Sequence, residues 1–193
     1  MYNKSSDRHF AWVSRSAFVG AAILGLGLAG GCGGNGSSGS SGPTEDDPNL
    51  KGITEAHNSA RASVSPAAQS PIPPLTWSAT IAQTAQSWAD NCMFEHSSGN
   101  YGENIYADTG QGTAADVVAD WVSEKEDYNY ASNSCAGVCG HYTQVVWAKS
   151  LNLGCAMKRC TSNSPFGNFG GGVWNFWVCN YDPPGNFNNQ KPY

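Results

Sequence analysis

Apolar positions at helical spacing dominate the first half of the chain. Between residues 49 and 64 they recur three or four residues apart, at Ile53, Ala56, His57, Ala60 and Val64. A stronger stripe follows between residues 78 and 92, at Ile81, Ala82, Ala85, Trp88, Ala89 and Cys92. Ser78 precedes this second stripe and is suited to cap its helix. The pattern therefore predicts two helices separated by the proline-rich loop of residues 65–75.

A third predicted helix begins at a capping box, Thr113 to Asp116, and carries a carboxylate on its apolar face. Val117, Trp121 and Glu124 follow at +4 and +3, and Tyr128 comes four residues later. A carboxylate that faces a core is costly unless it is paired or hydrogen-bonded. Glu124 is therefore either held by a partner or lies at the edge of the stripe with its head in water.

Beyond residue 140 the pattern changes to runs of β-branched and aromatic residues. Residues 141–148, 151–160 and 173–182 each predict a strand, and His141, Thr143, Val145 and Trp147 would share one face of the first. Residues 161–172 are rich in glycine and predict a long hairpin loop. Helices followed by strands, without alternation, predict an α+β fold with an antiparallel sheet.

The chain starts with the features of an export signal. Lys4, Arg8 and Arg15 precede an uncharged run over residues 17–30, which at 14 residues is shorter than the roughly 20 needed to span a membrane. Leu28 and the small residues after it resemble a bacterial lipoprotein processing box that ends at Cys32. We therefore predict a lipoprotein-type signal peptide over residues 1–32, with a lipidated Cys32 as the mature N-terminus and the membrane contacted only through that lipid.

Composition divides the remaining chain into a tether and one domain. Residues 33–48 are glycine- and serine-rich and predict a flexible linker, and residues 49–193 suit a single globular domain. The domain carries seven Lys and Arg against eleven Asp and Glu, a net charge of −4, and no basic cluster. Binding to a phosphate backbone needs clustered positive charge, so nucleic acid is excluded as a predicted partner.

Six cysteines lie in the predicted domain, at positions 92, 135, 139, 155, 160 and 179. An even number after an export signal predicts three disulfides, and the spacings lack the paired C-x2-C of zinc ribbons. Count alone leaves 15 pairings open.

Single candidates for chemistry are weak when taken one at a time. His96 and Glu103 lie in a segment dense in turn-forming residues, which is a usual place for ligand-binding groups but also for surface side chains. His57 is interpreted as structural, and His141 could be either structural or functional. The sequence contains no G-x-S-x-G, no H-E-x-x-H and no glycine-rich phosphate loop after a strand.

Several motifs together resemble the CAP superfamily of cysteine-rich secretory proteins, antigen 5 and plant pathogenesis-related group 1 proteins, with the plant group nearest. They are GHYTQVVW at 140–147, VCNYDPPGNF at 178–187, HNSAR at 57–61, GENIYA at 102–107 and WVSEKEDYNYASNSC at 121–135. The resemblance spans nearly all of residues 49–193. It implies a three-layer α-β-α sandwich with a central antiparallel sheet.

The resemblance also implies a site and a disulfide pattern. A cleft tetrad would consist of His96, Glu103, Glu124 and His141, and the two histidines would be the zinc ligands. The plant-type disulfides would be Cys92–Cys160, Cys155–Cys179 and Cys135–Cys139. Two protein ligands are fewer than zinc usually has, so weak, exchangeable metal binding is expected, with no organic cofactor. Residues 161–172 form a longer loop than in the plant proteins.

Three functions are consistent with this resemblance. The first is a secreted or surface-tethered, monomeric, non-enzymatic module that binds a sterol, fatty acid or other apolar molecule. The second is a zinc-dependent hydrolase or protease with Glu103 or Glu124 as general base. The third is a defence or signalling protein that releases its C-terminal peptide after Asp182.

Overall fold

The computed structural model describes residues 42–110 and 112–193. Its main sheet has four strands in the order β1-β5-β6-β2, and a separate two-stranded hairpin pairs β3 with β4. The strand bounds are β1 Thr76–Trp77, β2 Gly102–Asp108, β3 Tyr128–Asn129, β4 Ser134–Cys135, β5 Asn152–Cys160 and β6 Trp174–Asp182. The helices are α1 Ile53–Ala62, α2 Ala79–Ala89, α3 Ala114–Ser123 and α4 Gly140–Val145, with 3-10 turns η1 Glu124–Asp127 and η2 Phe169–Gly172.

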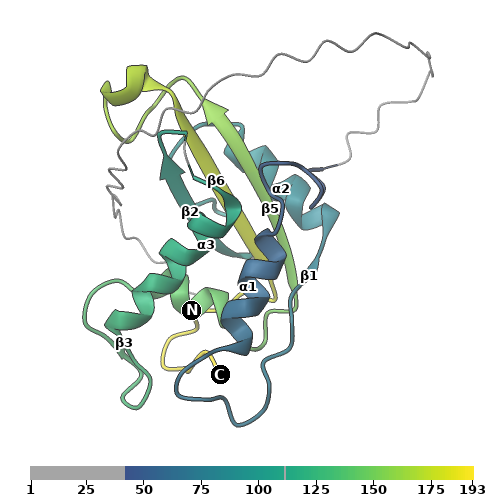
Figure 1. Ribbon diagram of the computed structural model, residues 1–193, viewed down its shortest axis with the longest axis vertical. Helices are drawn as coiled ribbons and strands as arrows, with labels where there is room; N and C mark the ends of the chain where they lie inside the picture. The colour runs from purple at the N-terminus through teal and green to yellow at the C-terminus, as the bar shows by residue number, and fades with distance from the viewer. Residues whose placement is uncertain (1–41, 111) are drawn as a thin grey trace, which may run out of the picture.

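Helices cover both faces of the sheet, so the predicted three-layer sandwich is confirmed. α1 and α3 lie together over one face, and α2 packs against β5 and β6 on the other (Figure 1). The close approach of α2 depends on Gly154, because a Cβ there would come within 2.1 Å of the backbone nitrogen of Ala82. The short α4 packs against α1 and α3 and contacts the first residues of β2.

β6 is the centre of the core, because both of its faces are covered. Trp174, Phe176 and Val178 point into the cluster beneath α2, whereas Trp177, Cys179 and Tyr181 belong to the cluster beneath α1 and α3. Residues of β6 are buried from Trp174 to Tyr181. A strand buried on both faces is apolar at most positions, which explains the long apolar run in the sequence, interrupted by the buried Asn175 and Asn180.

All three disulfides have the predicted pairing. Cys155–Cys179 joins directly opposite residues of β5 and β6, and Cys92–Cys160 joins the chain after α2 to the end of β5. Cys135–Cys139 closes a short loop between β4 and α4. The Cys92–Cys160 bridge closes a loop of 68 positions, for which chain entropy predicts roughly 4 kcal/mol of stabilisation.

The sheet is mixed rather than purely antiparallel. β5 pairs antiparallel with β6, and β6 with β2, as expected, but β1 runs parallel to β5. β1 is only two residues long and follows the proline-rich loop, so its sequence carried no alternation from which a strand could be predicted.

The strand predicted for residues 141–148 is wrong, because residues 140–145 form the helix α4. His141, Gln144 and Val145 are buried and lie at i, i+3 and i+4, so the same residues also satisfy a helical pattern. The Glu124 carboxylate accepts hydrogen bonds from the backbone N–H groups of His141 and Tyr142, which stabilises the start of this short helix.

Glu103 lies on a strand, although its segment was interpreted as a loop. β2 spans Gly102–Asp108 and pairs along its whole length with β6. Ile105 and Tyr106 favour a strand, but the turn formers before them masked that preference. The third helix begins at the predicted capping box, yet it ends at Ser123 and continues as η1, so Tyr128 belongs to β3.

Residues 1–41, which contain the predicted signal peptide, Cys32 and most of the linker, lie outside the described residues. The last part of the predicted linker, residues 42–48, forms turns before α1, and Gly42 lies against the backbone of Ala79 and Gln83 in α2. Within residues 42–110 and 112–193, no helix has the length and hydropathy needed to cross a membrane.

A buried arginine connects the loops at one end of the sandwich. Arg61 is 1% exposed, and its guanidinium donates to the carbonyl oxygens of Pro73, Val145, Trp147 and Ser150. Four carbonyl groups from two separate segments, at residue 73 and at residues 145–150, thus accept hydrogen bonds from one side chain. These hydrogen bonds offset the cost of burying the Arg61 charge, and the role of Arg61 is structural.

His57 is a buried histidine in the core beneath α1 and α3. It is fully buried, with Nδ1 2.7 Å from the Ile53 carbonyl oxygen and Nε2 2.8 Å from the Tyr181 hydroxyl. Burial lowers the pKa of His57 to about 4, the Ile53 bond opposes this effect, and the charge of Arg61 adds to it. The structural interpretation of His57 therefore agrees with its surroundings.

We predict that the free energy of unfolding falls by about 3 kcal/mol between pH 7 and pH 4 through His57 alone. The folded-state pKa lies below the unfolded value of 6.5, so the unfolded chain takes up the proton first as the pH falls. Urea unfolding at both pH values would measure the decrease. It should be smaller by that amount in His57→Gln, and an equal decrease in both proteins would contradict the prediction.

Candidate functional site

The first histidine of the predicted tetrad is held by the first glutamate. His96 Nδ1 lies 2.8 Å from Glu103 Oε1, and the Glu103 side chain is fully buried. Ser97 completes the binding of this carboxylate, with its backbone N–H at 2.8 Å from Oε1 and its hydroxyl at 2.5 Å from Oε2. β2 positions Glu103, and the loop after α2 wraps its own polar groups around that carboxylate.

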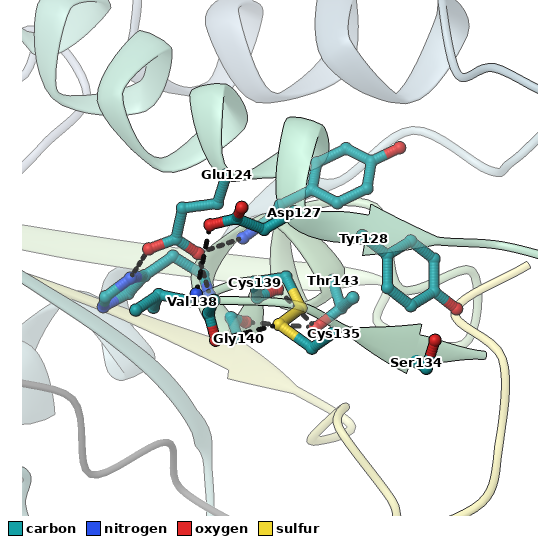
Figure 2. Close-up of a disulfide and its surroundings, with 12 residues drawn as sticks. Glu124, Asp127, Tyr128, Ser134, Cys135, Val138, Cys139, Gly140 and Thr143 are labelled. Carbon is teal, nitrogen blue, oxygen red and sulfur yellow. Dashed lines mark hydrogen bonds and ion pairs between the residues drawn. A yellow bond between two sulfur atoms is a disulfide. The ribbon is translucent and has the colours of Figure 1, made fainter. Parts of the chain in front are cut away.

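The second pair joins the end of α3 to the start of α4. His141 Nδ1 lies 2.6 Å from Glu124 Oε1, and Glu124 Oε2 accepts from the backbone N–H groups of His141 at 2.9 Å and Tyr142 at 3.2 Å. Figure 2 shows Glu124 reaching across to this part of the chain, with Asp127 beside it bonded to the Val138 amide. The partner that Glu124 needs in order to face the core is therefore α4 itself.

The two pairs are connected through β2. Asn104 follows Glu103 on that strand, and its side-chain amide donates to the His141 carbonyl oxygen at 3.1 Å. The same amide donates to the Tyr181 hydroxyl, which also contacts His57. Four residues that are distant in the sequence thus form two carboxylate–imidazole pairs linked by one buried asparagine.

A small hollow of about 30 Å³ lies against the second pair. Its lining residues are Phe94, Ile105, Tyr106, Asp120, Trp121, Glu124 and His141. His96 and Glu103 are not in this lining, although Phe94 and Ile105 lie two residues away from them. The Trp121 indole stacks on the His141 ring, with centroids 6.2 Å apart and planes inclined by 17°. The volume admits a water molecule or a small ion.

Two polar residues in this hollow were missed in the sequence. Asp120 lies one helical turn before Glu124; burial raises the pKa of Asp120 and the neighbouring Glu124 raises it further, whereas His141 lowers it. Burial also raises the pKa of Tyr106 to about 12, with Asp120 as the next cause. The i, i+4 spacing of Asp120 and Glu124 was the available signal, but Asp120 lies outside the apolar stripe.

Both pairs leave the same imidazole atom available. In each pair the carboxylate can accept from Nδ1–H, and in a neutral imidazole of that tautomer Nε2 is the nitrogen with the lone pair. Within the part of the chain that the structure describes, no three His, Cys, Asp or Glu side chains are grouped closely enough to hold a metal ion. Any metal ligation by these residues would therefore use one or two imidazoles and water.

The sequence places the chain in a family of extracellular proteins. Residues 54–181 match the CAP family, described as the Cysteine-rich secretory protein family, and the chain belongs to it. It is 43% identical over 155 residues to Pathogenesis-related protein 1 of Arabidopsis thaliana, covering 78% of this chain and 86% of that protein. It is 47% identical over 143 residues to Pathogenesis-related protein 1A1 of Solanum lycopersicum, covering 71% and 73%.

Solved structures have the same fold at lower sequence identity. The crystal structure of NaASP2 with Zn2+ matches with a TM-score of 0.63 at 24% identity, covering 82% of this chain and 90% of that one. Venom allergen-like protein 4 of Schistosoma mansoni matches with a TM-score of 0.56 at 24% identity, covering 73% and 90%. These likenesses establish the CAP sandwich as the fold.

We predict that Glu124→Gln lowers the free energy of unfolding by about 1–3 kcal/mol. The glutamine oxygen can take the place of Oε2 and keep the amides of His141 and Tyr142, but the NH2 group in the place of Oε1 cannot accept from His141 Nδ1–H. Chemical denaturation of the purified protein would measure the loss. Glu126→Gln is the matched control, because the side chain of Glu126 is 80% exposed, and it should change stability by less than about 0.5 kcal/mol. Equal effects of the two substitutions would contradict the prediction.

Proposed function

We propose that the protein is a non-enzymatic binding module whose His/Glu cleft takes up a divalent cation, zinc first, between the Nε2 atoms of His96 and His141. The observation that carries this proposal is that a glutamate fixes Nδ1 of each histidine, at 2.8 Å and 2.6 Å. A carboxylate behind an imidazole sets its tautomer and orients the other nitrogen toward a metal. A related fold solved with Zn2+ supports the choice of ion.

The donor set fits zinc in part. Imidazole nitrogen is a common zinc ligand, but stable sites have three or four protein ligands, and two imidazoles would leave the remaining positions to water. We therefore expect weak, exchangeable binding. Bound zinc would lower the pKa of such a water to about 7.

The hydrolase alternative needs a free general base, and the contacts of both glutamates argue against one. Glu103 accepts from His96 and from two groups of Ser97, and Glu124 accepts from His141 and from two backbone amides. A carboxylate has about four lone-pair sites, so three hydrogen bonds leave each glutamate little remaining capacity to accept a proton from water. This favours binding over catalysis.

A sterol or fatty acid needs more room than the hollow beside His141 offers. Ligand sites for such molecules have about 300–1,000 Å³, and this hollow has about 30 Å³. An apolar ligand therefore remains a proposal for another surface of the domain.

The structure does not favour release of a C-terminal peptide, because hydrogen bonds and ring contacts hold the segment after Asp182 on the domain. The Ser150 hydroxyl donates to the Pro183 carbonyl, and the Gly185 amide donates to Gln144 Oε1. The Tyr193 ring stacks on Tyr130 with centroids 4.6 Å apart. Cleavage alone would leave the segment attached through these contacts.

For localisation, we propose that lipidated Cys32 tethers a monomeric domain to a membrane surface through the linker of residues 33–48. The disulfides and the extracellular character of the family support export. The tether itself rests on the sequence pattern before Cys32.

We predict that His96→Ala/His141→Ala weakens zinc binding at least tenfold. Each substitution removes one of the two nitrogen ligands, and isothermal titration with ZnCl2 would measure the affinity at pH 7.5. His57→Gln is the matched control, since it removes a buried histidine with both ring nitrogens already engaged, and it should leave the affinity unchanged. Unchanged zinc affinity in the double variant would contradict the proposed site. If the wild-type protein had a peptidase or esterase activity that the double variant lacks, the hydrolase would be the better description of the function.

We predict that Cys32→Ser moves the protein from the membrane fraction to the soluble fraction of a bacterial host, because serine cannot take the lipid. Ser37→Ala, in the same linker, should stay with the membrane. Immunoblotting of both fractions measures the distribution, and a membrane-bound Cys32→Ser protein would count against the anchor.

A further inference from the structure

A second depression lies on the other side of α4 from the His141 hollow. It has a volume of about 300 Å³, and its walls come from the β3–β4 hairpin, the Cys135–Cys139 disulfide and the C-terminal segment between Asn186 and Pro192. Figure 2 shows one wall, where Tyr128, Ser134 and Thr143 lie around the Cys135–Cys139 disulfide. We name it the amide groove for its lining. It shares no lining residue with the hollow.

The lining of the amide groove is polar without being charged. It contains no Asp, Glu, Lys, Arg or His among the described residues. It contains five carboxamide side chains, Asn133, Asn186, Asn188, Asn189 and Gln190. The phenol of Tyr128 stays protonated, because burial raises its pKa to about 12. Such a surface offers donors and acceptors in nearly equal number and no net charge.

The walls of the groove are fixed before any ligand arrives. The Asn186 side chain accepts from the Thr143 hydroxyl at 2.8 Å and donates to the Gly140 carbonyl at 2.8 Å, which attaches the C-terminal segment to α4. Asn133 accepts from the Tyr128 hydroxyl at 2.7 Å. By contrast, Asn188 and Gln190 are exposed at the rim, and no side-chain hydrogen bond engages either within the described part of the chain.

An indole with an unused donor forms part of the base of the groove. Trp147 is 2% exposed and packs against Phe187, with ring centroids 6.1 Å apart. Its Nε1 has no hydrogen-bond partner among the described residues. A buried donor without an acceptor costs about 1–3 kcal/mol, and because Nε1 has almost no exposed surface, a ligand in the groove would not contact it directly.

We propose that the amide groove binds an uncharged saccharide. Sugar hydroxyls both donate and accept, as carboxamides do, and the C–H face of a sugar ring packs on an aromatic ring such as that of the half-buried Phe187. The missing charge disfavours phosphate, sulfated glycans and ions, and five amides disfavour a purely apolar ligand. A volume at the small end of ligand sites suits about one or two sugar rings. The inference does not depend on zinc in the other site.

The experiment titrates the full chain with chitotriose, cellotriose and maltotriose, and in parallel with a heparin tetrasaccharide and the tetrapeptide Gly-Ser-Asn-Gln with both termini blocked, so that it is uncharged. Isothermal titration calorimetry reports affinity up to about 10 mM ligand. We expect at least one neutral trisaccharide to bind, and Asn188→Ala/Gln190→Ala to weaken it at least tenfold.

Asn100→Ala/Gln69→Ala is the matched control, because it removes one exposed asparagine and one exposed glutamine outside the groove. It should leave the saccharide affinity unchanged. Thermal melting of each variant shows whether it is folded. Binding of none of the three trisaccharides, binding of the heparin fragment or the peptide alone, or saccharide binding that survives Asn188→Ala/Gln190→Ala would each overturn the proposal.

Discussion

Two carboxylates are taken out of water in this domain, and hydrogen bonds must replace their hydration. Glu103 obtains those bonds from His96 and Ser97, and Glu124 obtains them from His141 and the backbone of α4. Because an unpaired buried carboxylate is so costly, each glutamate fixes the chain segment that satisfies it. The loop after α2 and the position of α4 both follow from this requirement, and so does the orientation of the two imidazoles.

Patterns that extend over many residues were sufficient to predict the layers of the fold. The stripes of α1 and α2, the capping box of α3 and the long runs of β5 and β6 each repeat a local preference often enough to be read. α4 and β1 were not predicted correctly, since six and two residues carry too little periodicity. Their conformations depend on Glu124 and on β5, which lie far away in the sequence.

For the site, the sequence supplied residue types but not their contacts. The apolar stripe of α3 indicated that Glu124 needed a partner, and the family resemblance supplied His141 and the pair His96 and Glu103. The 2.6 Å hydrogen bond between His141 Nδ1 and Glu124 Oε1 depends on the position of α4, and the sequence of α4 had been interpreted as a strand. Asp120 was missed for a related reason: only the packed β2 shows that this exposed-looking position borders the same hollow as His141.

α4 separates two surfaces of opposite chemistry. His141 lines a narrow hollow with two neighbouring carboxylates, whereas Gly140 and Thr143 line the uncharged amide groove. The helix has six residues and is held at its start by Glu124 and at its groove side by Asn186. A ligand that displaced the Asn186 side chain would remove its hydrogen bonds to Gly140 and Thr143 in α4. A metal bound to His141 would restrict the motion of the same helix, whose first amides bind Glu124. Any coupling between the two surfaces would therefore pass through this helix and, by linkage, be equal in both directions.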